Sequence, residues 1–506
     1  MAPNLNPPSE EGKHRPPGLK PPSSPYTFKP MKSNFKWALE RWGGKRLRSH
    51  HDALSPLRAL SRPGGDFHSL VREARPDDRP RAIYVHVPFC SHNCTFCNLN
   101  RRSASPPPEY VDLVCREIEG FAALPYVRAG RYGAVYFGGG TPTSLPPEGI
   151  PRILGTLRAS LQISPDAEIT VETTVSDITS EHIAALREAG VNRLSVGIQT
   201  FCDRGRRLLG RWGTGEEAAA KLEGLLTAGF RNVGIDLIYN WPGQTPEELA
   251  ADLEIIASLD IAGVSFYPLI LHPEAPIVRL LSSGACPPMG DLAHERRLFD
   301  LIWEELTEAG FVLLELTKLV RPGRDAYRYV AIRYAGGDTL GLGAGAGGHL
   351  GNVLYLNPSD IPRWRARVKR GVPGPATPRM PAALHPPRRG NGGEAPTPVR
   401  GLIRAQGICA RVPPLYPLAY RLVGAVEFDR FRWAEFPLEL RAILAPELEG
   451  LAAAGLVRPS PAGFSLTPDG VFWGHNIARD LARTVIQALG EKPPPSAREE
   501  TTEEVG

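Results

Sequence analysis

The sequence predicts an α/β fold organised around a parallel sheet. From residue 82 onward, short runs rich in β-branched and aromatic residues alternate with stretches that have helical periodicity. This alternation is typical of βαβ units, in which a helix returns the chain to the start of the next parallel strand. Six such units suit either a partial barrel or an open doubly wound sheet. The six strand-like runs are residues 82–89, 134–137, 168–173, 193–199, 232–239 and 263–270.

The expected helices between these runs carry start and stop signals. Residues 109–124 and 180–189 have helical periodicity, and the second of these helices can begin with Ser180 as its cap and end at Gly190. Further along, Thr245 provides a cap, followed by a proline in the first turn and two glutamates near the positive end of the helix dipole.

The pattern changes after residue 290. Residues 291–309 predict one long helix, and residues 339–350 form a glycine-rich turn sequence. Near the C-terminus, residues 437–454 predict a helix, residues 455–467 a short hairpin, and the residues from Asp469 another helix. This order indicates a small winged-helix-like domain.

Proline marks the expected domain boundaries. The chain has 506 residues, enough for about three domains, and its 52 prolines, about twice the average usage, cluster in residues 1–30 and 371–400. We predict five parts: a basic, Pro-rich, partly disordered extension over 1–75, a catalytic barrel with its extension over 76–370, a Pro/Gly-rich linker over 371–400, a winged-helix-like domain over 401–490 and a disordered tail over 491–506.

Charge and hydropathy exclude several classes of protein. The formal net charge is +5, and residues 1–81 carry 16 basic and 8 acidic side chains. This basic extension could contact an acidic partner, but a solvated tail is the simpler interpretation, and nucleic acid is not an expected partner. No window approaches 18 uninterrupted apolar residues, and no secretion signal is visible, so the sequence predicts a cytoplasmic protein without a membrane span.

Chemically distinctive residues follow the predicted strands. Cys90 comes after the first strand, the Gly-Gly-Gly-Thr-Pro sequence 138–142 after the second, Glu172 closes the third, Gln199 the fourth and Asp236 the fifth. Because the carboxyl ends of parallel strands meet at one edge of the sheet, we expect these residues to gather there.

Three cysteines, Cys90, Cys94 and Cys97, lie within eight residues on one expected loop. A structural zinc site needs a fourth ligand, for which the local candidates are His86 and His92. An iron-sulfur cluster held by three cysteines instead leaves one iron without a protein ligand, where a cofactor can bind. The cluster is the favoured interpretation, ahead of zinc and of three inert thiols. The remaining cysteines are isolated and predict small buried side chains: Cys115, Cys202, Cys286 and Cys409.

Several motifs together resemble the oxygen-independent coproporphyrinogen III oxidase family of radical S-adenosylmethionine (SAM) enzymes. They are the strand 84–90 with its CxxxCxxC sequence, the glycine loop 138–142, the run 192–199, and Asp-Leu-Ile-Tyr 236–239 followed by Pro-Gly-Gln-Thr 242–245. The resemblance covers residues 80–350 strongly and the C-terminal block weakly. It implies a radical SAM partial (β/α)6 barrel that uses a 4Fe-4S cluster and SAM.

The resemblance also assigns roles to residues. It implies that Cys90, Cys94 and Cys97 bind the cluster. The positions that would line SAM are Tyr84, Phe96, Gly139, Gly140, Thr141 and Glu172. A second SAM would contact Gln199, Arg211, Asp236 and Ile270. We expect Arg211 and Asp236 to be partly exposed in the barrel mouth, although the two could instead pair with each other.

Departures from the family pattern guide the choice of reaction. Coproporphyrinogen decarboxylases carry a further cysteine after the third one, where this chain has the sequence 98–100, Asn-Leu-Asn, and the usual proline after Glu172 is absent. The sequences 94–97, 343–348 and 466–473 look like those of anaerobilin synthases, which open heme anaerobically with SAM as radical and methyl source. We therefore expect tetrapyrrole chemistry, with heme ring-opening and methyl transfer favoured over coproporphyrinogen decarboxylation, and with heme carriage as the non-enzymatic alternative. The expected partners are a tetrapyrrole and an electron donor such as flavodoxin or ferredoxin.

Overall fold

The computed structural model describes residues 33–58, 60–63, 67, 79–98, 101–230, 232–371 and 408–490. Most of the predicted linker and the whole predicted tail lie outside the described residues, as does the proline cluster of residues 1–30. The domain boundaries therefore stay predictions. Within the described residues, no helix is long and apolar enough to cross a membrane.

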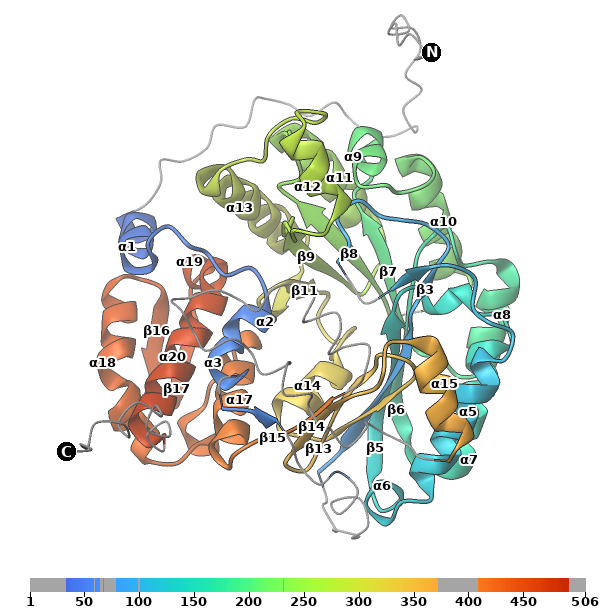
Figure 1. Ribbon diagram of the computed structural model, residues 1–506. Coiled ribbons are helices and arrows are strands. Elements are labelled where there is room, and N and C mark those ends of the chain that lie inside the picture. The colour runs from blue at the N-terminus through green and yellow to red at the C-terminus, as the bar shows by residue number, and fades with distance from the viewer. Residues whose placement is uncertain are drawn as a thin grey trace, which may run out of the picture. The chain divides into compact units, whose positions relative to one another are not determined.

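All six predicted strands are present and form the parallel centre of a larger sheet. Their spatial order, β2-β5-β6-β7-β8-β9, follows the chain without a reversal. A doubly wound sheet would reverse direction at a switch point, so this order is that of a barrel wall. Figure 1 shows the strands curving around a centre, with helices on the outer side. The six strands are β2 (Arg81–Val87), β5 (Arg131–Gly139), β6 (Gln162–Thr173), β7 (Arg193–Gln199), β8 (Val233–Tyr239) and β9 (Gly263–Pro268).

The helices of the outer layer begin and end close to the predicted signals. Thr245 caps α11 with a capping box. Its side chain accepts a hydrogen bond from the Glu248 amide, and the Glu248 side chain accepts one from the Thr245 amide. The predicted cap of α8 is wrong by one residue: the extended Thr179 accepts from the amide of His182, and Ser180 is already helical. The layer comprises α5 (Tyr110–Ala122), α7 (Gly149–Ser160), α8 (Ser180–Glu188), α10 (Gly215–Thr227), α11 (Pro246–Ser258) and α13 (Leu292–Glu308).

Both edges of the parallel sheet continue into further strands that the sequence analysis did not identify. Beyond β9 the sheet adds β11 (Lys318–Val320) and β10 (Val312–Glu315), both antiparallel. On the other side, β12 (Thr339–Leu342) pairs in parallel with β2. The predicted glycine-rich turn therefore forms strands as well as a turn. It leads into the antiparallel strands β13 (Gly347–Leu350), β14 (Val353–Leu356) and β15 (Ile408–Arg411).

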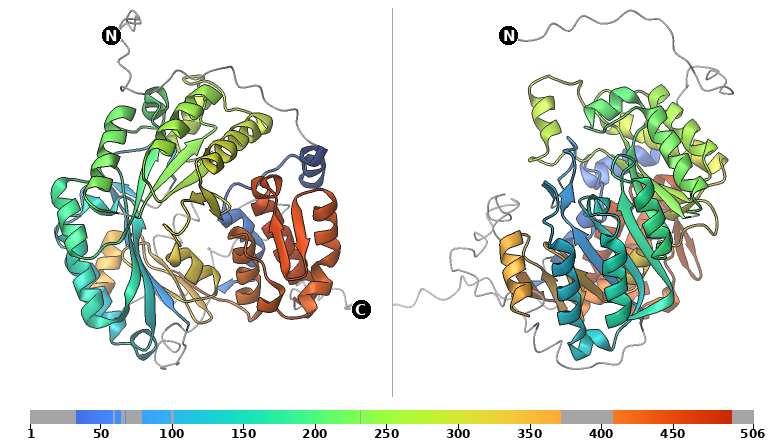
Figure 2. Two further views of the ribbon diagram at one scale, coloured as in Figure 1. Left: turned by 180° about the vertical axis from the view of Figure 1, so that it is seen from behind. Right: turned by 90° about the vertical axis from the view of Figure 1, so that its right-hand side faces the viewer.

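The C-terminal block has the expected helix, hairpin and helix order. Figure 2 shows its helices around the short hairpin β16–β17. The elements are α17 (Leu415–Glu427), α18 (Glu439–Ala453), β16 (Val457–Ser460), β17 (Gly463–Leu466), α19 (Pro468–Phe472) and α20 (Gly474–Leu489).

Part of the predicted basic extension is ordered and packs against this block. It forms the helices α1 (Ser33–Trp42), α2 (His50–Ala53) and α3 (Ser55–Arg58). The indole of Trp42 donates to Asp480 at 2.8 Å, and the Arg46 guanidinium donates both to the Phe472 carbonyl at 2.6 Å and to Glu295 at 2.5 Å. The described start of the chain is thus fastened both to the C-terminal block and to α13 of the barrel.

Candidate functional site

The cysteine loop leaves β2 at the carboxyl edge of the sheet and is tied down from several sides. Its short strand β3 (Phe89–Cys90) pairs with β4 (Arg102–Ser103). The Thr95 amide donates to the Leu209 carbonyl at 3.1 Å, and the Ile277 amide donates to the Thr95 carbonyl at 2.9 Å. The side chain of Phe96 packs against the apolar cluster around Trp241 and Leu269. Elements that follow β2, β7 and β9 therefore hold the loop in place.

Each of the three clustered thiols has a hydrogen-bond donor. Thr141 Oγ1 lies 3.6 Å from the sulfur of Cys90, Arg211 Nη1 lies 3.4 Å from that of Cys94, and Arg101 Nε lies 3.1 Å from that of Cys97. Burial raises the pKa of Cys90, and the nearby Cys97 and Cys94 raise it further. The three sulfurs are therefore close enough to interact electrostatically, in surroundings that supply donors to thiolates.

The two local candidates for a fourth zinc ligand make other contacts. His86, one candidate fourth ligand, is bonded to the Tyr84 hydroxyl at 2.8 Å, and His92 is bonded to Ser91 at 2.7 Å. Three thiols with separate donors fit a multinuclear cluster better than one ion.

An unpaired buried nitrogen also points to a bound group. Arg211 is buried, and its guanidinium donates to the Gly197 carbonyl and to Cys94, but its Nε has no hydrogen-bond partner. The expectation that Arg211 is partly exposed is therefore wrong, because the chain after β7 folds over it. A buried guanidinium beside a thiol fits an anionic or thiolate-rich ligand.

The glycine loop after β5 lets the backbone approach very closely. A Cβ on Gly140 would collide with the backbone of Phe89, and one on Gly139 would collide with the His86 ring. Gly139 also has φ of +113°, a conformation that favours glycine. The next residue, Thr141, is buried and donates its amide to the Phe89 carbonyl at 2.7 Å. The loop thus fixes Thr141 beside Cys90.

Glu172 lies at the end of β6 next to this loop. Its carboxylate accepts from the Tyr136 hydroxyl at 2.6 Å and from the Gly139 amide at 3.1 Å. Burial is the main cause that raises the pKa of Glu172, to about 7, and Asp236 contributes. The side chain keeps part of its surface open and can bind hydroxyl or ammonium groups of a ligand.

Two of the residues assigned to a second SAM, Gln199 and Asp236, lie on the adjacent strands β7 and β8. Gly197 on β7 faces Asp236 on β8, and Asp236 in turn faces Ser265 on β9. Burial raises the pKa of Asp236, although Lys318 lowers it, and the side chain is partly exposed as expected. Gln199 has φ of +73° at a register shift, which turns it out of the strand.

Asp236 and Arg211 do not form the ion pair considered as their alternative role. Among the residues that the structure describes, no ion pair joins the Asp236 carboxylate to the Arg211 guanidinium. Ile270 directly follows β9 and is partly exposed. The other described cysteines make separate contacts: Cys115 accepts from Thr156, and Cys202 donates to Glu248. The side chain of Cys409 lies outside the described residues.

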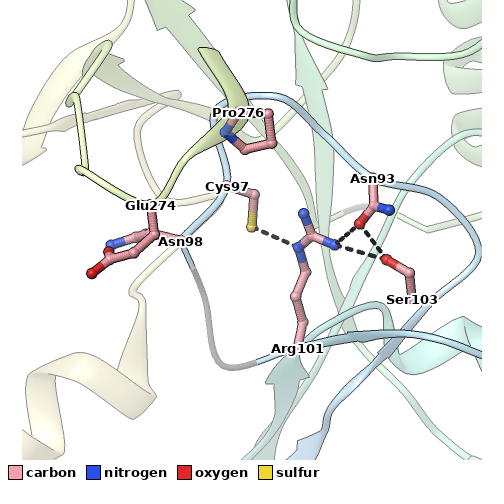
Figure 3. A pocket seen from close by; sticks show the side chains of 7 residues that line it. All are labelled: Asn93, Cys97, Asn98, Arg101, Ser103, Glu274 and Pro276. Carbon is pink, nitrogen blue, oxygen red and sulfur yellow. Dashed lines mark hydrogen bonds between the residues drawn. The ribbon is translucent and has the colours of Figure 1, made fainter. Parts of the chain in front are cut away.

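Sequence reasoning missed two residues of this region. Tyr136 lies on β5 two positions before the glycine loop, so strand alternation could have placed it on the same face as Gly138. Arg101 carries no such signal. Figure 3 shows its guanidinium between Cys97 and the pair Asn93 and Ser103. It lies in an open hollow of about 410 Å³ that is also lined by Asn98, Glu274 and Pro276.

Comparison with known proteins identifies the family. The model of the radical SAM superfamily matches residues 84–256. The chain is 30% identical over 415 residues to an anaerobilin synthase of Escherichia coli O157:H7, covering 81% of this chain and 85% of that protein. It is also 30% identical over 345 residues to the oxygen-independent coproporphyrinogen III oxidase of Escherichia coli K12, covering 65% of this chain and 73% of that protein. Its identity to the heme chaperone HemW of Bacillus subtilis is 28% over 291 residues, covering 56% of this chain and 75% of that protein.

A solved structure has the same fold. Coproporphyrinogen III oxidase from Escherichia coli, a radical SAM enzyme, aligns with a TM-score of 0.68 at 23% identity, over 88% of this chain and 98% of that chain. The chain therefore belongs to the radical SAM superfamily, in the family of coproporphyrinogen III oxidase-like enzymes that includes anaerobilin synthase. As a member, it is an enzyme whose cofactors are a 4Fe-4S cluster and SAM, and the predicted fold is confirmed.

Proposed function

We propose that this radical SAM enzyme acts on a tetrapyrrole, opening the heme ring without oxygen and transferring a methyl group. The observation that carries the proposal is the set of three thiols on one loop, each with its own donor, beside the glycine loop and Glu172. In this proposal Cys90, Cys94 and Cys97 bind the cluster. Bound together, the reduced cluster and SAM supply a 5′-deoxyadenosyl radical that can abstract a hydrogen atom from a substrate.

The chain's own residues orient SAM and shield it. In this proposal the backbone of Gly139 and Gly140 binds the methionine part of SAM, and the lack of a Cβ lets this loop pack against the His86 ring and the Phe89 backbone. Glu172 binds hydroxyl or ammonium groups, and the Tyr136 hydroxyl fixes the position of its carboxylate. Tyr84 packs beside Tyr136 with ring centroids 6.2 Å apart and forms an aromatic wall on this side.

A second ligand position on β7 and β8 supports methyl transfer in addition to radical formation. Asp236, Gln199 and the unpaired Nε of Arg211 offer contacts for a second SAM, whose amino acid part carries both charges. The sequence Asn-Leu-Asn, residues 98–100, follows the third cysteine in the region where decarboxylases carry a further thiol. Because this thiol is absent, we favour ring opening over coproporphyrinogen decarboxylation.

The extent of the similarity also favours anaerobilin synthase-like chemistry over heme carriage. The anaerobilin synthase match covers 81% of this chain, whereas the matches to heme chaperones cover 55 to 56%. The longer match extends into residues beyond the barrel. A flavodoxin or ferredoxin as electron donor and a location in the cytoplasm stay predictions from the sequence.

Anaerobic turnover with product analysis by mass spectrometry tests the proposal. The reconstituted protein, SAM and a chemical reductant are mixed with either heme or coproporphyrinogen III, and Cys94→Ala serves as the control without a complete cluster site. Heme should yield 5′-deoxyadenosine, S-adenosylhomocysteine and a methylated linear tetrapyrrole. Decarboxylated product from coproporphyrinogen would establish the alternative reaction. Tight heme binding with no SAM consumption would instead establish heme carriage.

A further inference from the structure

A short helix on the inner side of the sheet separates the SAM region from the C-terminal block. This helix, α14 (Arg328–Tyr334), packs against β2, β5 and α17. Figure 1 shows it within the curve of the sheet, on the opposite side of the strands from the outer helices. Its residues Tyr329 and Ile332 join an apolar cluster with Ala82, Ala134 and Tyr136. The helix therefore lies next to the residues that contact Glu172.

Arg333 on this helix is a half-buried cation without a carboxylate partner among the described residues. Its guanidinium lies 5.4 Å from the centre of the Tyr329 ring. The Tyr420 hydroxyl is the largest cause that raises the pKa of Arg333, and burial opposes it. No ion pair joins Arg333 to a carboxylate within the part of the chain that the structure describes. The side chain is enclosed by protein and yet keeps part of its surface open.

Other buried arginines of this chain have strong acceptors. Arg193 pairs with Asp325 at 3.0 Å and Arg46 with Glu295 at 2.5 Å, while Arg206 donates to backbone carbonyls, among them that of Trp212 at 2.6 Å. A guanidinium that is enclosed without an anion is costly, because it loses its hydration and gains little in return. Arg333 is therefore arranged for an acceptor that comes from outside the chain.

An aromatic row connects Arg333 to the SAM region. The ring of Tyr329 lies 4.6 Å from that of Tyr136 at an angle of 31°, and the ring of Tyr84 lies 6.2 Å from each of them. The Tyr136 hydroxyl in turn donates to Glu172. The row thus forms a largely buried aromatic connection between the SAM-binding carboxylate and the side of α14 that carries Arg333.

A second unpaired atom lies at the same junction. Nε2 of His349 is buried and has no hydrogen-bond partner. The His349 ring is 6.0 Å from that of Tyr416, which stacks on Tyr420 at 5.9 Å. Arg333 is one of the groups that lower the pKa of His349, so the two basic side chains lie within electrostatic reach of each other. The junction of α14, β13 and α17 is therefore basic and aromatic.

We infer that Arg333 is a substrate-binding residue that pairs with a carboxylate side chain of the tetrapyrrole, beside the aromatic row of Tyr329, Tyr136 and Tyr84. A guanidinium binds a carboxylate through two parallel hydrogen bonds, and aromatic side chains favour flat ring systems. The inference rests on the proposed function and adds to it the residue that recognises the acidic periphery of the substrate.

Binding of heme and of heme dimethyl ester tests this inference, because the ester lacks the carboxylates but keeps the ring. Affinities are measured by absorbance titration of the reconstituted full chain with SAM present. Arg333→Met should weaken heme binding about tenfold to a hundredfold, the range expected for one lost charge-assisted interaction. The ester should bind the parent and Arg333→Met equally. Arg328→Met is the matched control on the same helix, since Arg328 pairs with Asp166 at 3.1 Å, and it should bind heme like the parent.

Two further readouts keep the test decisive. Iron content and the melting temperature report whether Arg333→Met folds, and Arg333→Lys, which keeps the charge, should retain part of the discrimination between heme and its ester. Equal heme affinity of the parent and Arg333→Met, or equal loss of heme and ester binding, would overturn the inference while leaving the proposed function intact. A parent protein that binds neither heme nor coproporphyrinogen would overturn both.

Discussion

Replacing Arg101 by glutamine should lower the reduction potential of the cluster. The Arg101 guanidinium donates through Nε to the sulfur of Cys97 at 3.1 Å, and two further bonds, to Asn93 at 2.7 Å and to the Cys94 carbonyl at 3.3 Å, hold it there. A cationic donor to a cluster thiolate stabilises the reduced cluster more than the oxidised one, since reduction adds negative charge. Removing it should therefore make reduction harder.

The expected shift follows from the strength of this hydrogen bond. A hydrogen bond to a charged group contributes about 1.5 to 3 kcal/mol. The oxidised cluster is already anionic, so only part of this energy differs between the two redox states, and the open hollow around Arg101 admits screening water. Taking a third to a half of this energy gives about 0.5 to 1.5 kcal/mol, or about 20 to 65 mV for one electron, since a tenfold change in the equilibrium constant is 59 mV.

A redox titration followed by electron paramagnetic resonance measures the shift. Arg102→Gln is the matched control, because Arg102 is the adjacent residue but is exposed and donates to the Ser359 carbonyl. The potential should fall in Arg101→Gln and stay at the parent value in Arg102→Gln, with equal iron and sulfide contents in all three proteins. An unchanged or higher potential in Arg101→Gln would refute the reasoning.

The remaining predictions concern the ligands of the cofactors. Alanine substitution of Cys90, Cys94 or Cys97 should each cause loss of iron and sulfide, as measured by chemical analysis after anaerobic reconstitution, whereas Cys115→Ala should keep both. A cluster retained in any of the first three variants would contradict the ligand assignment. The affinity for SAM should rise from pH 6 to pH 8, because Glu172, with a pKa of about 7, is mostly protonated at the lower pH and the ionised form binds the ligand. Isothermal titration should find this slope absent in Glu172→Gln, and an equal slope in both proteins would refute the role. Asp236→Asn should keep or raise the melting temperature at pH 8, since burial disfavours its charged form, and should abolish methyl transfer. Arg211→Gln should lower the melting temperature modestly, because it loses buried hydrogen bonds, and should also abolish methyl transfer. Product formation retained in both variants would exclude a second SAM at this position.

The sequence was sufficient for the parts of the fold that depend on local periodicity. The six parallel strands alternate with helices that carry their own caps, so each unit is visible without its partners. The strands β12 to β14 are short, and β15 pairs with β14 although the predicted linker separates them in the sequence, which no local pattern can indicate. Helix α1 was hidden by the basic and proline-rich composition around it, although the buried residues Phe35, Ala38 and Trp42 have helical spacing.

The sequence also predicted only part of the candidate site. Strand ends predicted the positions of Glu172, Gln199 and Asp236, because parallel strands bring their carboxyl ends together. Arg101 and Arg333 could not be found, since neither belongs to a motif and their neighbours Cys97 and Tyr329 meet them only in the folded chain. The choice of reaction depends on such contacts as well.

We expect the C-terminal block to contribute to the proposed substrate site through α17, which packs against α14. It carries Tyr420, the group that acts most strongly on Arg333, and it is anchored by Arg46 and Arg48, which both bind Glu295 of the barrel. Arg46 also donates to the Phe472 carbonyl, so one side chain joins the start of the described chain, the barrel and the C-terminal block. Breaking one partner of a buried pair typically costs about 3 to 5 kcal/mol, because the other charge is left unpaired. The described part of the basic extension therefore joins the C-terminal block to the barrel, which a solvated tail would not do.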